Sequence, residues 1–169
     1  MTLPVLATYA TRAGSTAEVA HTVADVLRER GLQVDLQPVT NVHSVEAYSA
    51  VAVGAPLYMG RLHREVRAFL SAHRTELTQM PVALFVLGPV QHEEKDWKGA
   101  RAQLDNEMRR MPWLKPISIQ LLGGKFDPAK LRFPFSIFLR GMQPRDIRDW
   151  SAIRTMAGNF AASFEPSLH

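Results

Sequence analysis

The chain of 169 residues contains no cysteine. Disulfides, thiolate metal sites and thiol redox chemistry are therefore excluded, and any redox chemistry requires a bound cofactor. The sequence also lacks an apolar run of about 18 residues, which would predict a transmembrane helix, and it lacks the pattern of a secretory signal. With 46% hydrophobic residues, the composition predicts a single globular domain over residues 1–169 and favours a cytoplasmic protein.

Several ligand-binding motifs are also missing. No G-x-G-x-x-G follows the first apolar run, and Gly124-Lys125-Phe126 lacks the hydroxyl and the upstream glycine of a nucleoside-triphosphate loop. A phospho-receiver needs acidic residues after its first strand, where this chain has Tyr9-Ala10. No cluster of His, Asp or Glu has the spacing of metal ligands, so no metal is expected.

Apolar periodicity predicts strands that alternate with helices. The predicted strands are Leu3–Tyr9, Gln33–Pro38 (an edge strand), Ala50–Gly54, Val82–Leu87 and Ile117–Leu122, and the predicted helices are 15–30, 62–73, 96–110 and 150–164. This pattern predicts an α/β fold, a doubly wound five-stranded parallel sheet with helices on both faces. Ligands bind such sheets at the carboxyl ends of the strands, where the predicted loops are 10–16, 55–61 and 88–96.

The first of these loops has the composition of an anion site. It leads directly into an amphipathic helix, whose first turn carries unpaired N–H groups and a partial positive charge. Thr11, Ser15 and Thr16 can donate hydroxyl hydrogen bonds, and Gly14 allows the backbone to come close. The alternative is a helix cap that binds nothing. Among the common ligands of this architecture, FMN remains, with its phosphate in the first loop and its ring between the other two.

The motifs resemble those of flavodoxin-like proteins, and most closely the small branch of menaquinone-dependent protoporphyrinogen dehydrogenases. Residues 10–16, Ala-Thr-Arg-Ala-Gly-Ser-Thr, are similar to that branch's phosphate loop, Ser-Thr-Arg-Asp-Gly-x-Thr. Residues 52–60 with His63, and Asp149-Trp150 at the start of the last helix, also resemble it. The chain departs from the branch at Ala10 and Ala13, and the missing hydroxyl at Ala10 removes one phosphate donor.

The resemblance implies a flavodoxin-like fold with FMN as cofactor, held by the three loops. The implied binding residues are Thr11, Arg12, Ala13, Gly14, Ser15, Thr16, Pro56, Leu57, Tyr58, Met59, Gly60, Gly88, Pro89 and Val90. Because the flavin ring itself carries the chemistry, no catalytic residue is assigned.

Aromatic and histidine side chains near these loops have two interpretations each. Tyr58 is expected near the flavin ring, the alternative being a half-buried loop tyrosine. Trp97 is expected to pack in the core rather than to cover the ring. His63 and His92 lie near the predicted pocket edge, where a histidine can move protons, although surface or helix-capping roles are commoner there.

Residues 125–145 form a basic and aromatic insertion with a net charge of +4, equal to that of the whole chain. Its basic residues are Lys125, Lys130, Arg132, Arg140 and Arg145. The apolar stretch 133–139 is too short to span a bilayer but suits an anionic membrane surface, and the quinone-dependent branch has a similar insertion here. The alternatives are a segment packed over the sheet edge and a homodimer interface. Nucleic acid is not expected as a partner.

The resemblance implies an FMN-dependent oxidoreductase, a quinone-linked dehydrogenase of heme biosynthesis that passes electrons from a substrate such as protoporphyrinogen to a quinone. Such a protein would be cytoplasmic and peripheral on the inner face of the cell membrane. The alternative is a non-enzymatic electron carrier of the flavodoxin type, for which a strongly acidic surface would be expected. A third hypothesis is a flavodoxin-like fold that has lost FMN and serves as an interaction module.

Overall fold

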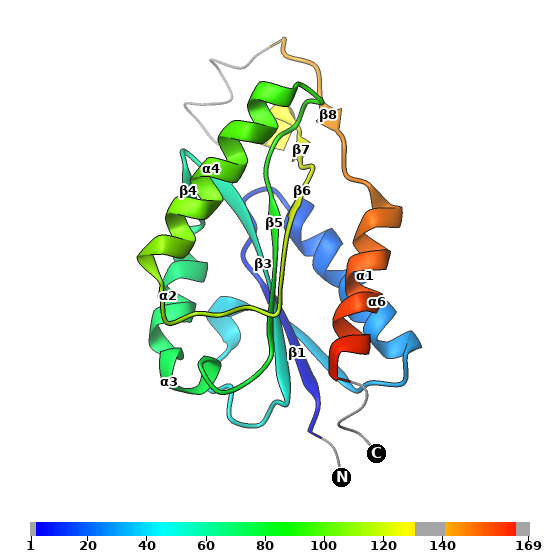
Figure 1. Cartoon of the computed structure of the whole chain (residues 1–169). Coiled ribbons are helices and arrows are strands. Elements are labelled where there is room, and N and C mark those ends of the chain that lie inside the picture. The colour runs from blue at the N-terminus through cyan, green and yellow to red at the C-terminus, as the bar shows by residue number, and fades with distance from the viewer. Residues whose placement is uncertain (1–2, 131–140, 165–169) are drawn as a thin grey trace.

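The computed structural model describes residues 3–130 and 141–164, and its centre is a parallel β-sheet (Figure 1). The five parallel strands are β1 (Val5–Tyr9), β2 (Val34–Pro38), β3 (Ala50–Tyr58), β5 (Val82–Leu87) and β6 (Ser118–Leu122). They lie in the order β2-β1-β3-β5-β6, which confirms the predicted doubly wound sheet and the edge position of 33–38. The strand order reverses between β1 and β3, so ligands are expected at the carboxyl ends of these strands.

Helices cover both faces of the sheet (Figure 1). On one face lie α1 (Ser15–Glu29) and α6 (Trp150–Phe164), and on the other lie α2 (Arg64–Ala72), α3 (Arg74–Leu77) and α4 (Glu94–Arg110). Short 3₁₀ turns occur at Val39–Asn41 and Pro128–Lys130.

The sheet separates two hydrophobic cores. Because side chains alternate along a strand, Val5 and Ala7 of β1 pack with α1 and α6, whereas Leu6 packs on the side of α2 and α4. In the central strands, the fully buried ring of Phe85 lies directly over Gly54, where a Cβ would collide with it. The site at the sheet edge therefore rests on a rigid, closely packed centre.

The predicted end of the third strand is wrong. β3 continues beyond Gly54 to Tyr58 and forms an antiparallel hairpin with β4 (Arg61–Leu62), turning at Met59 and Gly60 with positive φ angles of 49° and 80°. From the sequence, Pro56 indicates a loop, because proline lacks the N–H that a strand residue donates to the neighbouring strand. Its carbonyl nevertheless accepts a hydrogen bond from the His63 N–H at 3.2 Å, so the segment stays extended.

The helix predicted over 62–73 is correspondingly shorter, because Leu62 belongs to β4 and α2 begins at Arg64.

The described ends of the insertion form a small antiparallel sheet of β7 (Lys125–Phe126) and β8 (Arg145–Asp146). The apolar stretch 133–139, Arg132 and Arg140 lie outside the described residues. Within residues 3–130 and 141–164, no helix has the length and apolar character needed to cross a bilayer.

Candidate functional site

The loop between β1 and α1 is closed by its own residues. Gly14 has a left-handed backbone with φ of 91°, and its N–H donates to Thr11 Oγ1 at 2.8 Å. In this part of the chain no side chain caps α1, so the amides of its first turn stay available to a ligand. The loop therefore presents a helix N-terminus, with its partial positive charge, at the carboxyl edge of the sheet.

Thr16 carries a polar atom that the described chain leaves unsatisfied. Its side chain is fully buried, and its Oγ1 has no hydrogen-bond partner among residues 3–130 and 141–164. A buried hydroxyl without a partner costs about 1–3 kcal/mol of stability. An anion bound at the start of α1 would accept this hydrogen bond, so the loop fits a phosphate group.

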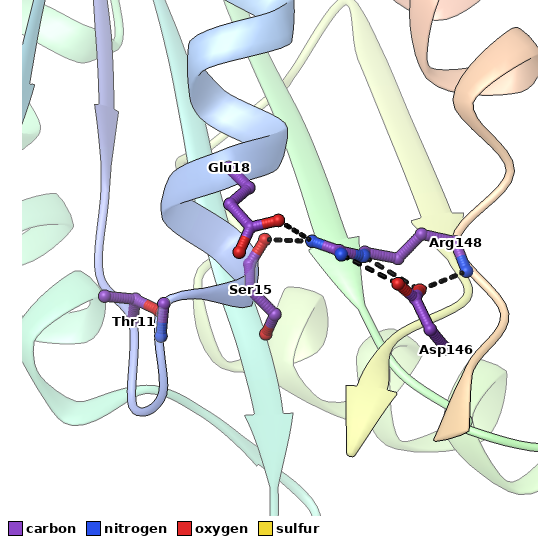
Figure 2. A network of polar contacts seen from close by, with 6 residues as sticks. Thr11, Ser15, Glu18, Asp146 and Arg148 are labelled. Carbon is purple, nitrogen blue, oxygen red and sulfur yellow. Dashed lines mark hydrogen bonds and ion pairs between the residues drawn. The ribbon is translucent and has the colours of Figure 1, made fainter. Parts of the chain in front are cut away.

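Ser15 is held from the far end of the chain. Figure 2 shows Arg148 reaching from the segment after β8 to the first turn of α1, where its Nη1 donates to Ser15 O at 3.2 Å and to Glu18 Oε2 at 3.1 Å. Two further nitrogens of the same guanidinium bind Asp146 in a bidentate pair at 2.9 and 2.8 Å. The first turn of α1 is thus tied to the base of the insertion.

The second loop contacts the first. The Arg12 guanidinium lies over the Tyr58 ring, 3.5 Å from its centroid, in a cation–π contact. Tyr58 and Met59 are exposed, by 41% and 85%, so the hairpin tip faces solvent at the sheet edge. The first loop, expected to hold the FMN phosphate, and the second loop, expected to hold the flavin ring, therefore lie side by side.

A buried carboxylate on α4 anchors this hairpin. Glu107 is only 2% exposed, and it accepts hydrogen bonds from Arg61 Nε and, at 3.3 Å, from the Leu62 N–H. The position of Tyr58 and its turn is consequently set by helix α4, nearly 50 positions later in the sequence.

The third loop follows β5 and borders two cavities. One of about 290 Å³ lies between this loop, β3 and α4, with Leu57, Gly88 and Pro89 in its lining. The other, of about 570 Å³, lies between residues 90–93 and 145–147. The structure therefore brings the second and third predicted loops together around one cavity, as the sequence led us to expect.

The comparisons with known proteins agree with this geometry. A family model described as a flavodoxin domain matches residues 6–139. The chain belongs to the flavodoxin-domain family. Protoporphyrinogen IX dehydrogenase (quinone) of Escherichia coli strain K12 is 35% identical to this flavodoxin domain over 88 residues, which are 49% of this chain and 47% of the relative. The chain thus spans about half the length of the curated relatives it matches.

Solved flavodoxin structures share the fold of this flavodoxin domain. Flavodoxin 1 from Bacillus cereus superposes with a TM-score of 0.62 at 15% identity, covering 94% of this chain and 97% of that chain. Rubredoxin oxygen:oxidoreductase from Desulfovibrio gigas superposes with a TM-score of 0.60 at 17% identity, covering 98% of this chain and 37% of that chain. These likenesses establish the fold.

Two side chains near the three loops of the candidate site have structural roles. Trp97 donates from its indole N–H to Gln91 O at 3.0 Å and packs against the core on the α2 and α4 side, which confirms the predicted packing role. His63 caps α2, because its Nδ1 accepts from the Glu65 N–H at 3.2 Å. Burial is the largest influence on the pKa of His63 and lowers it. The Glu65 carboxylate raises it in part and the neighbouring arginines lower it, so the pKa stays below its ordinary value and the neutral, accepting form is favoured.

His92 lines the cavity of about 570 Å³ and is exposed. Within the described part of the chain, no group of three or more His, Asp or Glu side chains is placed to hold a metal ion.

The roles of Arg148 and Glu107 in this flavodoxin domain were not predicted from the sequence. Arg148 contacts Ser15 across 133 positions, and no local pattern signals such a contact. Glu107 stands in a helix rich in charged residues, where an acidic side chain usually faces water. A buried position for it was therefore not predictable from helical periodicity.

Proposed function

We propose that this flavodoxin domain binds FMN and works as an FMN-dependent oxidoreductase. The observation that carries the proposal is the start of α1, where uncapped amides and the unpartnered hydroxyl of Thr16 lie together. A phosphate monoester would satisfy these donors and would gain from the helix dipole. The loops at 56–60 and 88–90 would hold the ring.

The departure from the related phosphate loops at Ala10 is compatible with this proposal. Ala10 is 2% exposed and belongs to the core on the side of α2 and α4, so its methyl group serves packing. The Thr11 hydroxyl oxygen accepts from the Gly14 N–H, and a hydroxyl that accepts can still donate its proton, so Thr11 can serve as a donor for the phosphate. Ser15, Thr16 and the amides of the first turn complete the set.

When bound, FMN supplies the transfer of electrons or hydride that the protein's own side chains lack. The chain's part is to bind and orient the cofactor. Arg12 and Tyr58 set the contact between the first and second loops, and Glu107 fixes the second loop on α4.

We further propose that the reaction is a quinone-linked dehydrogenation, with protoporphyrinogen as electron donor and a quinone as acceptor, in heme biosynthesis. The similarity over 88 residues to the E. coli protoporphyrinogen IX dehydrogenase supports this choice of substrates. The net charge of +4 supports it over a flavodoxin-type carrier that docks on basic partners.

Rapid-mixing experiments on the FMN-loaded protein distinguish the two functions. Protoporphyrinogen should reduce the oxidised protein, and a menaquinone analogue should reoxidise the reduced protein much faster than it reoxidises free reduced FMN. A carrier would instead exchange electrons quickly with an iron–sulfur or reductase partner and would show no advantage over free FMN toward the quinone.

The insertion at 125–145 is proposed to contact an anionic membrane surface, where a quinone would be reached. Its described residues include exposed Lys130 and Met142, the latter 50% exposed. Each basic residue near such a surface contributes about 1 kcal/mol of binding free energy. Reversal of charge at Lys130, Arg132 and Arg140, the last two outside the described residues, should abolish co-sedimentation with anionic vesicles.

Neutral vesicles and added salt provide the controls for this experiment, because both weaken an electrostatic contact. If the wild-type protein ignores anionic vesicles, the membrane proposal is wrong, and a dimer in sedimentation velocity would then favour the alternative of a homodimer interface at the insertion.

A further inference from the structure

Arg148 is the most extensively bonded charged side chain next to the proposed phosphate loop. Its side chain is only 3% exposed, and one guanidinium serves Asp146, Glu18 and Ser15 O at the same time (Figure 2). Its charge also lies 4.8 Å from the ring centroid of Trp150. A buried arginine with this many partners is fixed in position, because its fork of donors is used in several directions.

We propose that Arg148 is a positioning residue that sets the affinity of the α1 start for a phosphate group. The proposal deepens the proposed function, since FMN would bring that phosphate, but the anion site can be tested without FMN. Arg148 acts through Ser15 and through the charge balance around the loop.

The first effect is geometric. The Ser15 carbonyl and the Thr16 N–H belong to one planar peptide unit. A guanidinium that holds Ser15 O at 3.2 Å therefore also fixes the direction of the Thr16 N–H. That N–H is one of the unpaired donors of the first helical turn.

The second effect is electrostatic. Glu18 and Asp146 place two carboxylates beside the start of α1, where each would repel a phosphate dianion. Arg148 lies between them, at 3.1 Å from Glu18 Oε2 and 2.8 Å from Asp146 Oδ2. Its positive charge offsets one of the two negative charges and spreads over both ion pairs. Without it, Glu18 and Asp146 lose their shared ion-pair partner, although Asp146 keeps a nearby cation, the ammonium of Lys125.

The test uses Arg148→Gln, with Arg154→Gln as a matched control. Arg154 of α6 pairs with Glu29 at 2.7 Å, so it too forms an ion pair with α1, but at the end of α1 opposite to Arg148. The probe is inorganic phosphate, followed through the backbone amide NMR signals of Ser15, Thr16 and Ala17 in the full chain. Thermal unfolding of each variant shows that it is folded.

We expect phosphate to shift these amide signals in the wild-type protein. Arg148→Gln should weaken the phosphate affinity about tenfold, the size expected for loss of one charge a few ångströms away in a partly screened site. Arg148→Lys should recover only part of it, because an ammonium keeps the charge but lacks the fork that reaches Asp146 and Ser15 together. Arg154→Gln should leave the affinity unchanged.

The same variants are then titrated with FMN and with riboflavin, which lacks the phosphate. Arg148→Gln should lower the affinity for FMN and spare riboflavin. Equal phosphate affinity in Arg148→Gln and wild type, or amides that do not respond to phosphate in the wild type, would overturn the proposal. Phosphate binding that depends on Arg148 without any FMN binding would uphold it and would refute the proposed cofactor instead.

Discussion

Replacing Thr16 by valine should change stability and cofactor affinity in opposite directions. The substitution keeps the β-branched shape but removes the hydroxyl, which is fully buried and has no partner among the described residues. A buried hydroxyl without a partner costs about 1–3 kcal/mol, so its loss should raise the free energy of unfolding of the cofactor-free protein by about 1 kcal/mol. For a domain of this size, that corresponds to a rise in Tm of about 2–4 °C.

The effect on FMN should be a loss. If the Thr16 hydroxyl donates to the phosphate, the hydrogen bond is charge-assisted and is worth about 1.5–3 kcal/mol. The Kd for FMN should then rise about ten- to a hundredfold. Riboflavin has no phosphate, so its Kd should not change. Calorimetric unfolding and fluorescence titration measure the two effects on the same preparations.

Thr8 on β1 is the matched control. It is also fully buried with an unpartnered Oγ1 in the described chain, but it belongs to a strand rather than to the loop. Thr8→Val should therefore raise Tm and leave the Kd for FMN unchanged. If Thr16→Val leaves FMN binding intact, or weakens FMN and riboflavin equally, the Thr16 hydroxyl does not contact the phosphate.

Two further predictions concern the frame of the site. Glu107→Ala should lower the free energy of unfolding, measured by urea titration, by about 2 kcal/mol, because the Leu62 N–H and the partly exposed Arg61 lose their buried acceptor. A loss below about 0.5 kcal/mol, which is the range of ordinary surface substitutions, would contradict the anchoring role of Glu107. Because burial lowers the pKa of His63 from 6.5, the folded chain binds a proton at His63 more weakly than the unfolded chain does. The stabilisation by neutral His63 is therefore fully present above pH 6.5 and is lost as the pH falls below that value. His63→Asn keeps a good helix cap without titrating, so urea midpoints measured at pH 7.5 and 5.5 should differ less in the variant than in the wild type.

The order of elements was predictable because each core strand is a nearly continuous apolar run, as in Val82–Leu87, with all six residues buried. The extension of β3 was not, since Pro56 normally marks the end of a strand. Here the hairpin is stabilised by Leu62 N–H donating to Glu107, a contact that local sequence patterns do not report.

The composition of the proposed phosphate loop was predictable from the sequence, but the contacts that hold the loop in place were not. Hydroxyls and Gly14 before a helix signal an anion site by local spacing alone. Arg148, which ties this loop to the insertion, lies 133 positions from its contact at Ser15. Such contacts arise from the return of the last helix to the side of α1, which only the folded chain displays.

A paired titration of the cofactor-free protein with FMN and with riboflavin shows whether the chain binds FMN through its phosphate. With several charge-assisted hydrogen bonds to the phosphate, each worth about 1.5–3 kcal/mol, we predict one FMN per chain with quenched fluorescence, and riboflavin bound at least about a hundredfold more weakly. Equal affinity for the two flavins, or no binding of FMN, would contradict the account.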